Sequence, residues 1–252
     1  MTTFRLLWRI VSACFGLALV ATMSVAGLLA FPQPLYAYHV GQGRLHLYSD
    51  RPFNELAGRA VLADVEGRLA KAPAGFRDDL GVYRIFVTNE EWRRRLVFLW
   101  NGGAAGVNYA PVGGGVFIRQ SDIDHNKVLK ADATPVPEPR TLAYYAGHEI
   151  GHSLISNHIG AIANWRLPAW QREGMADYIA MGGVVDVDAL ARARRSGEVD
   201  LDPKRSGNYA LYRLLIAFLL DKEHWSPDEL LASGMTLTEA EKRLDLSLPS
   251  GP

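Results

Sequence analysis

The chain has 252 residues, of which 48% are hydrophobic, so it can form a core and is not disordered overall. Its 27 Lys and Arg residues balance 27 Asp and Glu residues. Because no basic excess is available to neutralise a phosphate backbone, we expect no nucleic-acid partner. The single cysteine, Cys14, excludes an internal disulfide and a cluster of thiolate metal ligands.

The N-terminal segment, residues 1–32, differs from the rest of the chain. Residues 10–31 carry no charge and would form a helix of about 33 Å, enough to cross a bilayer. This run is longer than the roughly 7–15 apolar residues of a signal-peptide core, which favours an uncleaved anchor. Arg5 and Arg9 precede it and should stay in the cytoplasm, so the remainder would be extracytoplasmic. The alternative is a cleaved signal, which would make the protein secreted.

The segment before residue 137 contains strand and helix patterns in alternation. Strands are predicted at 43–49 and 82–88, a helix at 53–71, and a second helix, capped by Thr88 with Glu91, up to Trp100. The glycine-rich stretch 101–115 has no GK[ST] and is not a P-loop, so it predicts a hairpin between GVNYA and GVFIRQ. Residues 113–120 are either an edge strand that pairs with an extended peptide substrate or a plain strand of the sheet.

The proline-rich stretch ATPVPEPR, residues 133–140, predicts a stiff connector between two lobes. After it, helices are predicted at 141–158, 168–181, 188–196, 207–222 and 227–233, followed by a short helix capped by Thr238 with Glu241. The expected fold class is therefore α+β. A small β-sheet lobe, about 38–137, would pack on a helical lobe, about 138–246, within one domain spanning 33–252.

The stretch HEIGH carries the first candidate chemistry. His148 and His152 are four residues apart, so on a helix they share one face and can bind one metal ion. Zinc is a suitable ion, because it binds imidazole nitrogen well. Glu149 lies beside that face, where it would take a proton from water rather than bind the metal. Such a string also arises by chance, in which case it is a helix with two surface histidines and one acid.

A second helix supplies the missing ligand. In LPAWQREGMADYIA, Glu173 and Asp177 are again four residues apart. Catalytic zinc usually has three protein ligands, and Glu173 would complete the set with the two histidines. Asp177 would accept the other ring N–H of a ligand histidine. A solvated charged face is the alternative, but the helix is mostly apolar, and a buried carboxylate needs a partner such as a metal.

Glycines inside the HEIGH helix each cost about 1 kcal/mol relative to alanine. Ala143, Gly147 and Gly151 recur every four residues and form a flat stripe. We expect the stripe to let the helix that carries Glu173 approach closely.

Together, HEIGH and the following WQREGMADY resemble the gluzincin zinc metallopeptidases, whose hallmark is HExxH followed by a helix with E-G-x-A-[DE]-Y. The resemblance is strongest over 141–181. It implies a zincin-like fold with Glu149 as general base, His148, His152 and Glu173 as zinc ligands, and Asp177 behind them. The chain lacks a G-x-M-E-N segment, which argues against aminopeptidase action of the kind that larger relatives show.

These features predict a membrane-anchored, extracytoplasmic zinc metallopeptidase that binds one Zn²⁺ and hydrolyses peptide or protein substrates. The alternative is a catalytically idle, zinc-stabilised module that binds a peptide or partner. Gluzincin relatives often stabilise the reaction's oxyanion with a tyrosine or histidine beyond the third ligand. The candidates here are Tyr209, Tyr212 and His224, and we favour Tyr209 because it begins a helix after a turn.

Overall fold

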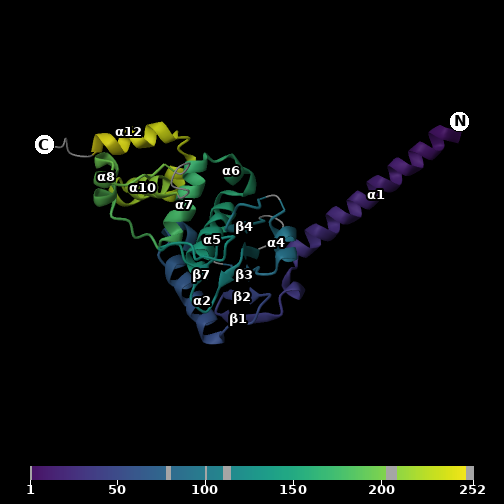
Figure 1. Cartoon of the computed structure of the whole chain (residues 1–252). Coiled ribbons are helices and arrows are strands. Elements are labelled where there is room, and N and C mark those ends of the chain that lie inside the picture. Colours follow the sequence, from purple (N-terminus) through teal and green to yellow (C-terminus); the bar gives the residue numbers. More distant parts are fainter. Residues whose placement is uncertain (1, 78–80, 100, 110–114, 203–208, 248–252) are drawn as a thin grey trace.

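The computed structural model describes residues 2–77, 81–99, 101–109, 115–202 and 209–247. One long helix, α1, projects from a globular part that contains all other elements (Figure 1). The first half comprises α1 (Thr2–Ala30), η1 (Gln33–Leu35), β1 (Tyr38–Gln42), β2 (Leu45–Ser49), α2 (Glu55–Leu69), α3 (Ala74–Arg77), β3 (Tyr83–Val87), α4 (Glu91–Val97), β4 (Gly106–Asn108), β5 (Gly115–Ile118), β6 (Ser121–Asp122) and β7 (Lys127–Val128). The second half comprises α5 (Leu142–Ile159), α6 (Ala161–Arg166), α7 (Ala169–Ala180), α8 (Val187–Ser196), α10 (Ala210–Ala217), the π-helical turn η2 (Phe218–Lys222), α11 (Pro227–Ala232) and α12 (Leu237–Ser247).

The chain is 57% helix and 13% strand, which confirms the expected mixed α+β class. Five strands form one sheet in the order β1-β2-β3-β5-β4. The two outer pairs, β1 with β2 and β4 with β5, are antiparallel, whereas β2, β3 and β5 run parallel. The short hairpin of β6 and β7 forms a second sheet.

Two of the expected local features are wrong. Residues 113–120 contain β5, which lies between β3 and β4, so this segment is not an edge strand. Within the described sheet the two edge strands are β1 and β4. The Thr88–Glu91 capping box is absent from α4, because Thr88 is fully buried and its hydroxyl bonds to the Tyr36 hydroxyl.

The start of the last helix differs from the prediction. The last helix, α12, begins earlier than expected, and its start is capped by Thr236 with Glu239 rather than by Thr238 with Glu241. Residues 207–208, the expected start of the helix that contains α10, lie outside the described residues.

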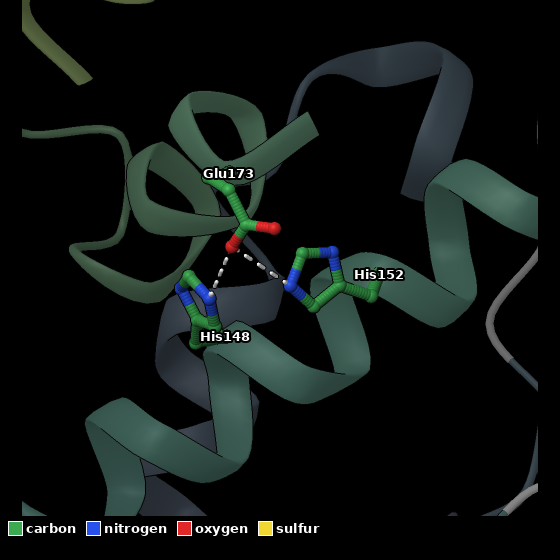
Figure 2. A group of neighbouring side chains, drawn as sticks. All are labelled: His148, His152 and Glu173. Carbon is green, nitrogen blue, oxygen red and sulfur yellow. Dashed lines mark ion pairs between the residues drawn. The ribbon is translucent and has the colours of Figure 1, made fainter. Parts of the chain in front are cut away.

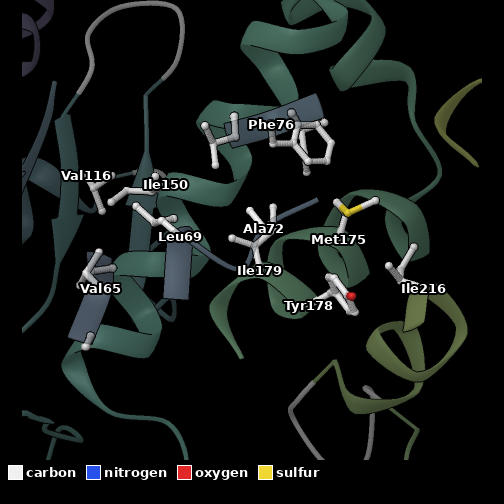
Figure 3. Packing of buried hydrophobic residues seen from close by; sticks show 14 of the residues in the cluster. Val65, Leu69, Ala72, Phe76, Val116, Ile150, Met175, Tyr178, Ile179 and Ile216 are labelled. Carbon is white, nitrogen blue, oxygen red and sulfur yellow. The ribbon is translucent and has the colours of Figure 1, made fainter. Parts of the chain in front are cut away.

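The main core runs from one face of the sheet through three layers of helix. Figure 3 follows it from Val116 of β5 and Ile150 of α5 to Met175 of α7 and Ile216 of α10. The same core includes residues on both sides of the proline-rich connector. The sheet and the HEIGH helix therefore share one hydrophobic interior, and this shared packing fixes α5 relative to the strands.

The opposite face of the sheet is covered by a smaller aromatic cluster. Phe86 and Phe117 stack with ring centroids 5.1 Å apart, and Tyr36, Val97 and Phe98 pack around them. Leu29, near the end of α1, packs against this cluster. α1 is long and apolar enough to cross a membrane, and none of its most apolar window is buried by the rest of the chain.

Candidate metal centre

The HEIGH sequence lies in the middle of α5, which is buried for most of its length. Thr141 caps the helix start, where its hydroxyl oxygen accepts the backbone N–H of Tyr144. His148 and His152 project from successive turns of the same face, with ring centroids 4.8 Å apart. The helix therefore presents both imidazoles to one point, as their spacing predicts.

Helix α7 approaches α5 along the predicted glycine stripe. A Cβ atom placed on Gly151 would lie 3.0 Å from the Cα atom of Ala176, and one on Gly147 would lie 3.5 Å from the Cα atom of Ala180. Real Cβ contacts are rarely as short as the first of these, so Gly151 permits an approach that a larger residue would hinder. The expected close contact between the two helices is confirmed, and it brings Glu173 to the histidines.

Figure 2 shows Glu173 of α7 directed at both rings of α5. Its Oε2 atom lies 3.5 Å from Nε2 of His148 and 3.4 Å from Nε2 of His152. One ligand atom from each of the three side chains lies within 4.8 Å of the other two, so the group could hold one metal ion. Burial alone would raise the pKa of Glu173, but the two histidine rings hold it well below its usual range. The Glu173 carboxylate is thus anionic, as a metal ligand would have to be.

Glu149 lies on the same helix beside the two histidines, and only 8% of its surface is exposed. Burial raises the pKa of its carboxyl above the usual glutamate range, an effect that the neighbouring histidines oppose. Strand β4 passes immediately over it. A Cβ atom on Gly106 would lie 2.8 Å from Oε1 of Glu149, so glycine at this position leaves the room that the carboxylate occupies. Asn108, also on β4, donates hydrogen bonds to the Glu149 carbonyl oxygen and to the Ser153 hydroxyl.

Asp177 is fully buried behind His148, where it has two strong partners. One oxygen accepts a hydrogen bond from the Tyr144 hydroxyl, and the other accepts one from Nη1 of Arg213 at 2.5 Å. The distance from Asp177 Oδ1 to His148 Nδ1 is 3.9 Å, too long for a hydrogen bond. His148 Nδ1 is buried without a hydrogen-bond partner among the described residues. Asp177 therefore ties α5, α7 and α10 together. The predicted hydrogen bond from a histidine ring N–H to Asp177 is wrong, because both carboxylate oxygens bond to Tyr144 and Arg213 instead.

Tyr209 precedes α10 and stacks on His148, with ring centroids 5.8 Å apart and planes inclined by 7°. Burial, followed by the negative charges of Glu173 and Glu149, raises its pKa to about 12. The phenol is therefore a protonated donor at neutral pH. Tyr212 stacks behind Tyr209 at 5.8 Å.

A cleft of about 840 Å³ opens over these residues. His148, Glu149, His152, Glu173 and Tyr209 all line it, whereas Tyr212 and His224 are not among the described residues at its wall. Strand β4 and the segment from Val128 to Lys130 also line it. The cleft is therefore lined both by the helices that carry the candidate ligands and by the β4 edge of the sheet.

The site contains residues that sequence patterns did not single out: Gly106, Asn108, Tyr144, Gly174 and Arg213. Gly174 lies where α7 meets α10, and it allows a close approach there as the glycine stripe does between α5 and α7. A Cβ atom on Gly174 would lie 2.8 Å from the Tyr212 carbonyl oxygen. The glycine lets α10 approach and bring Arg213 to Asp177. A signal was present in the EGMAD stretch itself, where a glycine follows the candidate ligand in a mostly buried helix.

Comparisons with known proteins add no assignment. No protein-family model matches the chain, and no curated protein matches it significantly.

Proposed function

We propose that this protein is a zinc-dependent metallopeptidase of the gluzincin type, held in a membrane by α1 with its globular part on the extracytoplasmic side. The observation that carries the proposal is the convergence of His148, His152 and Glu173, from two separate helices, beside a buried glutamate in a cleft. A solvated charged face would not place these side chains together in the interior.

The donor set fits zinc. Bonds of about 2.0–2.1 Å in a tetrahedral site place neighbouring ligand atoms about 3.3 Å apart. The distances of 3.4 and 3.5 Å from Glu173 to the two imidazole nitrogens are close to this value. Two imidazoles and one carboxylate also form a known catalytic zinc set that leaves a fourth position open. When bound, the ion would act as a Lewis acid that polarises a substrate carbonyl and makes water nucleophilic.

The side chains around the cluster fit the remaining tasks of peptide hydrolysis. Glu149 is buried, and its raised pKa suits a group that accepts a proton from water and returns it to the leaving amine near neutral pH. Tyr209 keeps its proton and lies over the His148 ring, where its hydroxyl would donate to the oxyanion. The two groups have complementary roles in this proposal: Glu149 accepts a proton from water, and Tyr209 donates a hydrogen bond to the oxyanion.

Strand β4 is the structural candidate for substrate binding, in place of the interior strand β5. It is one of the two edge strands of the described five-stranded sheet, and Gly106, Val107 and Asn108 line the cleft. An extended peptide that paired with this edge would gain main-chain hydrogen bonds and pass over Glu149. The neutral net charge of the chain gives no preference for acidic or basic peptides.

The test uses the full chain in detergent. A shorter chain that begins at residue 38 would lack Leu35 and Tyr36, which pack in the outer cluster. Zinc content and cleavage of a peptide library are measured for wild type and Glu149→Gln. We expect wild type to contain zinc and cleave, and the variant to contain zinc without cleaving. Zinc without cleavage by either protein would instead support the idle binding module, and equal cleavage by both would refute Glu149 as the base.

A further inference from the structure

Helix α6 connects the two ligand helices and buries none of its residues in the globular part. Ile162 and Trp165 are 71% and 78% exposed, so its two largest apolar side chains project away from the core. A helix of six residues is too short to be stable by itself in water. Exposed apolar side chains that gather into a patch mark a surface that meets a partner or a membrane.

A second group of exposed apolar side chains lies around α4. Trp92 is 54% exposed, and Leu99, just after the helix, is 59% exposed. Phe31, the first residue after α1, is 73% exposed. Tryptophan and other amphipathic rings gather at the ends of membrane spans, where the headgroups begin. Phe31 lies at the point where the chain would leave a bilayer.

The arrangement of the elements places both groups on one side of the molecule. Figure 1 shows α4 beside the end of α1, and α6 on the side of the globular part from which α1 projects, whereas α8 and α12 lie on the opposite side. The connection is packed, because Leu29 of α1 and Phe98, directly after α4, belong to the same outer cluster. A bilayer that surrounds α1 would therefore lie next to α4 and α6.

We propose that a membrane-contacting surface, formed by Trp92, Leu99, Ile162 and Trp165, enters the headgroup region of the bilayer that α1 crosses. The occupant is a phospholipid interface, because the apolar span of α1 positions one beside this surface. The inference rests on the proposed membrane anchorage and is independent of the peptidase chemistry. It gives α6 the apolar contact that the globular part does not supply, and it holds the cleft beside the membrane.

The experiment labels single cysteines with an environment-sensitive fluorophore in the full chain carrying Cys14→Ser. Ile162→Cys reports on the proposed surface. Leu246→Cys is the matched control, since Leu246 is 77% exposed on α12, on the far side of the molecule. Both proteins are reconstituted into vesicles of phosphatidylcholine and phosphatidylglycerol in equal parts, with and without nitroxide-labelled lipid.

We expect the label at position 162 to shift its emission to the blue and to be quenched severalfold more by the nitroxide lipid than the label at 246. Equal, weak quenching at both positions would overturn the proposal. A second label at Trp165→Cys guards against a local effect of one substitution and should behave like position 162. Zinc content is measured on the same samples. Membrane contact without bound zinc would refute the proposed zinc peptidase and would still support the membrane-contacting surface.

Discussion

Helix α5 packs on two sides by opposite means. Toward the sheet it presents large aliphatic side chains such as Ile150, which lies near Val116 in Figure 3. Toward α7 it presents Gly147 and Gly151, which let the backbones meet. Neighbouring side chains can partly relax around a large side chain that is shortened by one methyl group. A backbone contact of this kind has no such freedom and sets the distance between the helices directly. The side that carries the two glycines is the one that brings the candidate metal ligands of α5 and α7 together.

Substitution of Gly151 should have the largest effect, because it separates α5 from α7. Gly151→Leu places a branched side chain where a Cβ atom alone lies 3.0 Å from Ala176. We expect loss of zinc together with a large loss of stability, and Gly151→Ala should retain the fold with weaker zinc binding. The adjacent Ile150→Val tests the other side and should cost about 1 kcal/mol in stability with zinc retained. Normal zinc affinity in both Gly151 variants would show that the stripe does not set the site.

Tyr209→Phe removes one hydroxyl from the cleft and changes little volume. If the phenol donates to the oxyanion, kcat should fall about 100- to 1000-fold, with zinc content and stability near wild type. Tyr212→Phe is the matched control, since Tyr212 stacks behind Tyr209 and should be almost fully active. The reverse result would exchange the roles of the two tyrosines, and full activity in both would place the donor elsewhere.

Gly106→Ala tests the sheet side of the cleft. The added methyl group would lie 2.8 Å from the Glu149 carboxylate, which would have to move. A displacement of about 1 Å at a catalytic group commonly costs about 100-fold in rate, so kcat should fall by that order while zinc is retained. Gly103→Ala is the control in the preceding loop, because a Cβ atom there meets no other atom within 4 Å. Equal rates for the two variants would contradict the assigned position of Glu149.

Asp177→Asn should have the smallest effect among the site variants. It weakens the ion pair with Arg213, although the Tyr144 hydroxyl can still donate to the new amide oxygen. Loss of a group that hydrogen-bonds a metal ligand typically costs about 10- to 100-fold in metal affinity or activity. Asp177 stands 3.9 Å from His148 Nδ1 without bonding to it, so we expect a loss at the lower end of this range. Zinc affinity measured by competition with a chelator checks this range. An unchanged affinity with reduced stability would assign Asp177 to helix packing alone.

The parts of the site that were predictable from sequence are those carried by local spacing. His148, His152 and Glu173 converge because two helices with a known periodicity each present one face, and the glycine stripe indicates that the helices meet. Tyr144 and Arg213 could not be predicted in the same way. The contact of Tyr144 with Asp177 depends on how α5 is rotated against α7, and that of Arg213 depends on how α10 crosses α7. That crossing is set by tertiary packing at Gly174.

The order of the strands in the sheet could not be predicted from local patterns either. Alternation identified the segment that became β5, but edge position depends on which strands pair, and β5 acquired β3 and β4 as neighbours. The Thr88–Glu91 cap failed for a related reason: burial beneath Tyr36 gave the Thr88 hydroxyl a different partner. Local patterns describe what a segment favours, and long-range contacts decide which of these preferences survive.

The most direct test of the account is the metal content of the purified full chain, measured by elemental mass spectrometry beside Glu173→Ala. We expect about one zinc ion per wild-type chain after dialysis against a weak chelator and almost none in the variant, because a site with two histidines alone binds zinc poorly. Stoichiometric zinc in Glu173→Ala, or no zinc in a folded wild-type chain, would contradict the proposed metal centre.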